Sequence, residues 1–159
     1  MKSQEEEVLD GQDEISKQTL SWTQALLTTT APFQQISLSQ VQQISPTALA
    51  YLGDAIYELY VRMLYLLPLR RTGIYHRLVV EQVRAETQAL HLRSLIPYLR
   101  DTELEIVRRG RNAATGRPKR LNPEIYQQAT SLETLIGYLY LTDYQRLTEL
   151  LQMLHVEKE

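Results

Sequence analysis

Cysteine is absent from this 159-residue chain. Its absence excludes disulfides and any zinc or iron–sulfur site held by thiolates. Phenylalanine and tryptophan occur once each, whereas tyrosine occurs ten times. No apolar run approaches the roughly 20 residues that a membrane-spanning helix needs, and the first residues lack the basic start and apolar stretch of a secretory signal. The sequence therefore predicts a soluble, cytoplasmic protein without a membrane partner.

A strong excess of either charge is also absent, but the charges are unevenly distributed. Residues 1–40 carry a net charge of −4 within a total of −2. Residues 107–120 contain no acid and six bases, which are Arg108, Arg109, Arg111, Arg117, Lys119 and Arg120. Such a cluster favours contact with the phosphates of a nucleic acid, although a solvated loop or ion pairs with Glu103 and Glu105 would also explain it.

Apolar residues recur at helical spacing through most of the chain, and no segment shows the alternation of a strand. We expect helices over about 45–66, 75–90, 101–110, 124–141 and 143–155, with Asp101 as the N-cap of the third. The predicted fold class is all-α, a compact helical bundle formed by residues 41–159. Residues 1–40 are predicted to be an acidic, polar and partly disordered extension, with a short helix over about 21–27.

Two acidic residues stand in the most apolar of these helices. Asp54 lies in the segment 45–66, which is apolar nearly all round and is expected to be central and buried, and Glu133 lies in 124–141. A buried carboxylate without a partner is costly, and one explanation is a shared divalent cation. Small residues around both acids, including Gly53 and Gly137, would let the two helices approach closely.

The donor types restrict which cation these acids could hold. Mg²⁺ takes oxygen ligands and is typically held by one or two carboxylates plus waters, whereas the scattered histidines and missing cysteines argue against zinc. Glu58, one turn after Asp54, is a candidate outer ligand of the same ion. The alternative is that these acids are solvated or pair with Arg62 and Arg84.

Three motifs resemble the ribonuclease III family. Tyr-Leu-Gly-Asp-Ala-Ile-Tyr-Glu over 51–58 is similar to its signature helix, and Glu-Thr-Leu-Ile-Gly from Glu133 is similar to its second helix. Val-Arg-Arg-Gly-Arg-Asn-Ala over 107–113 resembles the short subfamily called Mini-III, as does the pair His76 and Arg77. The resemblance covers about residues 40–155.

The resemblance implies the ribonuclease III fold and a Mg²⁺-dependent endoribonuclease that cuts double-stranded RNA, leaving 5′-phosphate and 3′-hydroxyl ends. It implies a homodimer, which the apolar faces of the segment 45–66 also suit. Asp54 matches the catalytic aspartate and Glu133 the metal-binding glutamate. Mini-III proteins lack the separate double-stranded-RNA-binding domain and are associated with maturation of 23S ribosomal RNA, which leaves room for a ribosomal protein as helper.

Some acids of longer family members are missing here. The corresponding positions read Thr47, Ala50 and Thr130, so the number of metal ions in the site stays open. Duplex RNA is recognised mainly through phosphates and 2′-hydroxyls. The predicted RNA-binding residues are Arg108, Arg109, Arg111, Asn112, Arg117, Lys119, Arg120, His76 and Arg77.

Two other functions are compatible with the sequence. One is a non-catalytic RNA-binding scaffold with the same fold, and the other is a helical protein–protein adaptor tethered by its acidic N-terminal segment. Two acids in apolar helices argue against the scaffold, and binding of RNA at low salt would argue against the adaptor.

Overall fold

The computed structural model describes residues 36–115 and 120–154. The chain divides into two units, Met1–Ser37 and Leu38–Glu159, and the fold described here is that of the second. The predicted helix over 21–27 lies outside the described residues. The helices are α2 (Leu38–Gln43), α3 (Pro46–Leu66), α4 (Thr72–Val83), α5 (Ala85–Leu95), the 3₁₀ helix η1 (Ile96–Tyr98), α6 (Asp101–Ala113), α7 (Pro123–Thr142) and α8 (Tyr144–Met153). The described residues form no strand, which confirms the all-α prediction.

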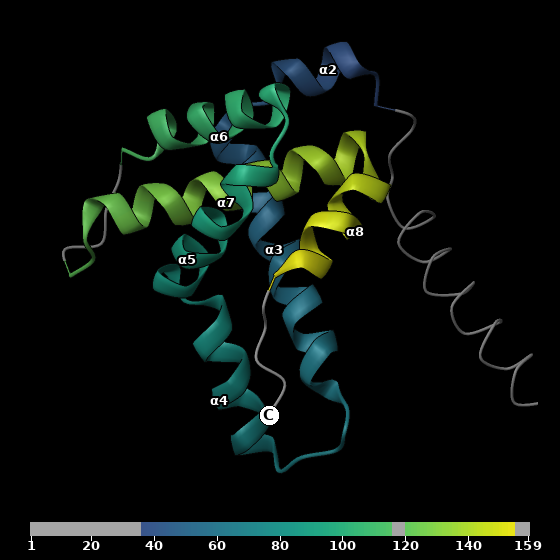
Figure 1. Ribbon diagram of the computed structural model, residues 1–159, viewed down its shortest axis with the longest axis vertical. Coiled ribbons are helices and arrows are strands. Elements are labelled where there is room, and N and C mark those ends of the chain that lie inside the picture. Colours follow the sequence, from purple (N-terminus) through teal and green to yellow (C-terminus); the bar gives the residue numbers. More distant parts are fainter. Residues whose placement is uncertain (1–35, 116–119, 155–159) are drawn as a thin grey trace, which may run out of the picture. The chain divides into compact units, whose positions relative to one another are not determined.

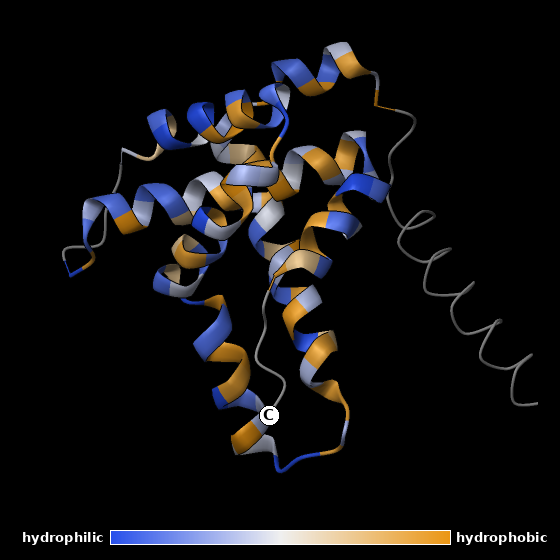
Figure 2. Ribbon diagram, in the orientation of Figure 1, coloured by the Kyte–Doolittle hydropathy of each residue, from blue (hydrophilic) through white to orange (hydrophobic). Residues whose placement is uncertain are grey.

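Helix α7 is the centre of the fold. It packs most extensively against α3, α5 and α6, and α8 folds back onto it, whereas α4 packs against α3 and α5 (Figure 1). Apolar and polar residues share most of these helices (Figure 2), and the apolar ones meet in one core that includes Tyr57, Val61, Leu132, Leu135 and Leu147. Within the described residues, no helix is both long and apolar enough to cross a membrane.

Helix α3 begins as its sequence predicts. The Ser45 side chain accepts a hydrogen bond from the backbone N–H of Ala48 at 3.1 Å, and Pro46 occupies the first turn, where its missing N–H costs nothing. The expectation that α3 is buried all round is wrong. Tyr51 is 86% exposed and Met63 56% exposed, because the surrounding helices cover only one side of α3.

The single helix predicted over 75–90 is also wrong, since α4 and α5 separate at Arg84, whose backbone is extended (φ −66°, ψ 152°). The break leaves carbonyl groups at the end of α4 without helical partners. Side chains of α5 bind two of them: the Thr87 hydroxyl donates to the Glu81 carbonyl at 2.6 Å, and the Gln88 amide donates to the Val83 carbonyl at 3.0 Å. Polar residues thus interrupt what periodicity alone presents as one helix.

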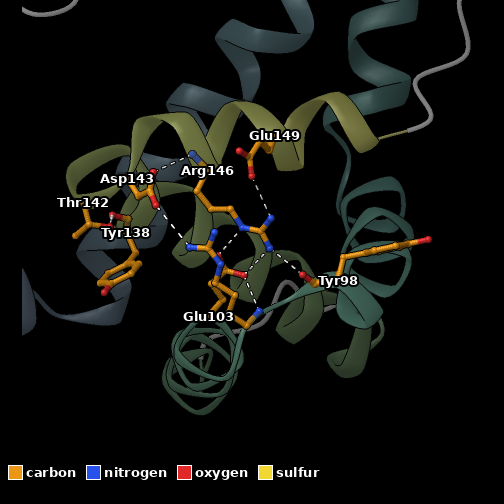
Figure 3. Close-up of polar contacts among 8 residues, drawn as sticks. Tyr98, Glu103, Tyr138, Thr142, Asp143, Arg146 and Glu149 are labelled. Carbon is orange, nitrogen blue, oxygen red and sulfur yellow. Dashed lines mark hydrogen bonds and ion pairs between the residues drawn. The ribbon is translucent and has the colours of Figure 1, made fainter.

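Helix α6 is fixed at its first turn by a buried ion pair (Figure 3). Arg100 and not Asp101 is the N-cap, and Glu103 accepts a hydrogen bond from the Arg100 backbone N–H at 2.8 Å. Arg146 of α8 donates to Glu103 at 2.8 Å, and the two side chains are 12% and 3% exposed. Burial alone would raise the pKa of Glu103, but these donors hold it below its usual value. Removing one partner of such a pair typically costs about 3–5 kcal/mol.

Candidate active site

The two helices that carry the predicted catalytic acids cross at a pair of glycines. A Cβ atom added at Gly53 of α3 would collide with the backbone carbonyl of Glu133 in α7. A Cβ atom at Gly137 would likewise collide with the backbone carbonyl of Leu49. The backbones therefore touch here, which explains why glycine occupies both positions. The close approach that the small residues predict is confirmed.

This crossing brings the carboxyl groups of Asp54 and Glu133 close enough for each to shift the pKa of the other. Asp54 as a whole is exposed, which corrects the expectation of a buried residue, whereas Glu133 is half-buried. Asp54 follows Gly53 directly, so the glycine contact also sets how far the aspartate stands from α7. The site is consequently an open edge of the helix crossing and not an enclosed core position.

Burial raises the pKa of both carboxyl groups. For Asp54 the charge of Glu58 is the second cause. For Glu133 the second cause is the charge of Asp54, and its pKa rises to about 7. Among the described residues, the groups that shift these two pKa values include no cation. A cation bound between the two acids would favour their charged forms.

Glu58 lies one turn along α3 but has a partner of its own. Its Oε2 accepts from Arg62 at 2.8 Å in an i,i+4 pair. In the part of the chain that the structure describes, no cluster of three or more acidic, histidine or cysteine side chains is placed to hold a metal ion. The structure thus brings together Asp54 and Glu133, and it leaves Glu58 ion-paired beside them.

The basic segment is partly helical. The predicted helix end near Gly110 is wrong, because α6 continues to Ala113, which places Arg111 and Asn112 on its exposed last turn. Arg108 makes two hydrogen bonds to Glu105, at 2.6 and 2.8 Å, as the ion-pair alternative predicts. Arg120 is exposed. The other two predicted bases, Arg117 and Lys119, lie outside the described residues.

An open groove of about 590 Å³ lies where the end of α6 meets the start of α7. Arg111 and Asn112 line it from α6, and Tyr126 and Gln127 line it from α7. Sequence reasoning missed Tyr126 and Gln127, because only the fold brings them beside the basic segment. The abundance of tyrosine is the one sequence signal that could have drawn attention to Tyr126.

The remaining predicted RNA-binding residues lie elsewhere. His76 and Arg77 are exposed on α4, and α4 and α6 occupy opposite ends of the unit (Figure 1). The two groups of candidates therefore form separate patches within one chain.

Comparisons with known proteins identify the family of this chain. Residues 47–144 match the family model described as "Ribonuclease III domain", and this span contains both Asp54 and Glu133. The chain is 62% identical over 116 residues to a protein of Synechocystis sp. strain PCC 6803 named "Mini-ribonuclease 3", covering 73% of this chain and 81% of that protein. A protein of the same name from Synechococcus sp. strain PCC 6301 is 58% identical over 123 residues, covering 77% of this chain and 89% of that protein.

A solved structure has a similar fold. The X-ray structure of a protein from Fusobacterium nucleatum is similar with a TM-score of 0.65 and 30% identity, covering 70% of this chain and 92% of that one. The family match and the fold thus define a ribonuclease III domain. The chain belongs to the ribonuclease III family, and within it to the Mini-III subfamily, and it is an endoribonuclease.

Proposed function

We propose that this endoribonuclease uses Mg²⁺ to cut double-stranded RNA and leaves 5′-phosphate and 3′-hydroxyl ends. The observation that carries the proposal is the pair of carboxyl groups of Asp54 and Glu133, which the close crossing of α3 and α7 at Gly53 and Gly137 brings together at an open edge of the fold. Two oxygen donors of this kind suit Mg²⁺, which is commonly held by one or two carboxylates, waters and substrate phosphates.

Asp54 and Glu133 would hold the ion. A bound Mg²⁺ lowers the pKa of a coordinated water and neutralises charge on the phosphoryl oxygens. Glu133 is half-buried and its backbone is locked against Gly53, so it provides the fixed ligand. Asp54 is the exposed member of the pair, so its carboxylate is the one that RNA can approach, and we assign it the orientation of the attacking water.

The groove at the α6–α7 junction supports duplex RNA as the substrate. Side chains cannot read the narrow major groove of duplex RNA, so recognition relies on phosphates and 2′-hydroxyls. Arg111 and Asn112 offer a charge and an amide for these groups, and Tyr126 adds a hydroxyl-bearing ring on the facing wall. Arg109, Arg120, His76 and Arg77 extend the proposed contact, whereas Arg108 would first have to leave Glu105.

The exposed side of α3 supports a homodimer. Tyr51, Leu59, Met63 and Leu66 recur at helical spacing and are between 47% and 86% exposed. An apolar stripe of this kind on a helix is suited to an interface with its own copy. Tyr51 is one turn before Asp54, so this interface would place the two sites of a dimer beside it, as cutting of both strands requires.

The biological setting follows from the family resemblance. We propose maturation of 23S ribosomal RNA in the cytoplasm, with a ribosomal protein as a candidate helper. The test is incubation of the protein with precursor 23S RNA, a generic duplex and a single strand, with and without Mg²⁺, followed by analysis of the product ends. We expect Mg²⁺-dependent cuts in duplex segments with 5′-phosphates. Binding without cleavage under all conditions would favour the alternative, a non-catalytic RNA-binding scaffold.

A further inference from the structure

Gln88 lies in the first turns of α5 and is only 2% exposed, an unusual depth for an amide side chain. Its backbone N–H donates to the Arg84 carbonyl at 3.1 Å, so the break between α4 and α5 fixes the start of this helix. Helix α5 packs closely against α7. The buried amide group of Gln88 therefore lies near the α4–α5 junction, on a helix that packs against the one that carries Glu133.

The amide nitrogen of Gln88 has one hydrogen-bond acceptor and one charged neighbour. It donates to the carbonyl of Val83, the last residue of α4, at 3.0 Å. The Gln88 side chain also lies beside the carboxyl group of Glu133 and, as a nearby donor, lowers its pKa. An amide nitrogen can satisfy both acceptors at once. Gln88 thereby links Glu133 of α7 to the Val83 carbonyl at the end of α4.

The oxygen of the same amide group, in contrast, has no hydrogen-bond partner in the part of the chain that the structure describes. Among the described residues, no donor pairs with the buried Oε1 atom of Gln88, and a buried acceptor without a donor destabilises the fold unless something supplies one. This oxygen belongs to the same amide group that contacts Glu133, so it lies close to the proposed metal site. Waters retained by a bound Mg²⁺ are donors of the right kind.

We propose that Gln88 is a positioning residue for Glu133: it holds the carboxylate in the orientation that binds a divalent cation and offers its Oε1 to the water that the cation retains. The inference rests on the proposed metal site of Asp54 and Glu133. A purely structural role, in which Gln88 only caps α4 through the Val83 carbonyl, is the competing explanation.

The chain offers a matched control. Gln82 in α4 also has a buried Oε1 without a partner among the described residues, and its side chain is not among the groups that act on Glu133. Gln82→Met and Gln88→Met therefore both remove an amide whose Oε1 is buried without a partner in the described chain, but of the two only Gln88 acts on Glu133. Gln88→Asn retains an amide but shortens its reach, so it serves as a second variant if Gln88→Met fails to fold.

The experiment measures Mn²⁺ binding to the full-length, RNA-free protein by calorimetry and by electron paramagnetic resonance of the free ion. We expect Gln88→Met and Gln88→Asn to raise the Mn²⁺ dissociation constant about 10-fold or more, which is typical for the loss of a group that orients a metal ligand. Gln82→Met should stay within about twofold of the wild type, and thermal unfolding should show that the compared variants are folded.

Three results would overturn the inference, and they can be told apart. If Glu133→Gln loses Mn²⁺ binding but folded Gln88 variants bind like the wild type, Gln88 is merely structural and the metal site stands. If the wild type binds no Mn²⁺ that depends on Glu133, the metal site and the role of Gln88 both fail. A Gln82→Met variant that weakens binding as much as Gln88→Met would also refute a specific role for Gln88.

Discussion

Replacing Glu133 with glutamine should change how the stability of the metal-free protein depends on pH. Burial and the neighbouring Asp54 raise the pKa of Glu133 from 4.5 to about 7 in the folded chain. Between these two pH values the folded state holds a proton that the unfolded state has released. The contribution of Glu133 to stability is therefore fully present below pH 4.5 and is lost as pH rises through 7.

The magnitude follows from the shift. The shift from 4.5 to about 7 corresponds to roughly 3 kcal/mol at 1.36 kcal/mol per pH unit. Between pH 5 and pH 8 the expected loss is about 2–3 kcal/mol, because part of the total occurs below pH 5. Glutamine keeps the size and the hydrogen-bonding groups but does not titrate, so the variant should escape this loss.

The assay is urea unfolding of both proteins with a chelator at pH 5, 6, 7 and 8. We expect the unfolding free energy of Glu133→Gln to rise relative to the wild type across this series, by about 2–3 kcal/mol. Glu124→Gln, an exposed position on the same helix, is the control and should follow the wild type. Parallel curves for Glu133→Gln and the wild type would show that Glu133 is not a perturbed carboxyl group and would refute the reasoning.

Three further predictions concern other parts of the molecule. Gly53→Ala forces a methyl group against the backbone of α7 at Glu133, so urea unfolding should show a loss of about 1–3 kcal/mol, and an unchanged stability would mean that the helices are further apart. Replacing Arg109 and Arg111 with alanine should weaken binding to all duplexes. The slope of log K against log salt should become less steep by about one to two, which corresponds to the loss of one or two phosphate contacts. An unchanged slope would show that these two residues do not contact the RNA. Tyr51→Glu should shift the sedimentation profile from dimer to monomer, and a variant that remains dimeric would place the interface elsewhere.

The sequence predicts the helices well where local signals are strong. Ser45 and Pro46 define the start of α3, and Asn122 and Pro123 mark the start of α7 in the same way. The break at Arg84 could not be predicted, because its stabilisation depends on side chains that bind carbonyls of the preceding helix. The extension of α6 beyond Gly110 was missed for a related reason, since a glycine that permits close packing on Thr134 looks like a helix end.

The two acids could be found from the sequence because each stands in a recognisable apolar motif. Their exposure could not, since periodicity shows that α3 is apolar on several sides but not which side its neighbours cover. Tyr126 and Gln88 lie outside the motifs and acquire their proposed roles only through the packing of α7 on α6 and α5. Residues that act through tertiary contacts can therefore be identified only from the structure.

The most direct test of the central claim is cleavage by an Asp54→Asn variant under single-turnover conditions, with duplex binding measured separately. The substitution removes the exposed carboxylate of the pair and preserves its size. We predict that cleavage in Mg²⁺ is abolished while the duplex dissociation constant changes little. Cleavage at the wild-type rate by the folded variant would contradict the assignment of Asp54 and Glu133 as the active site.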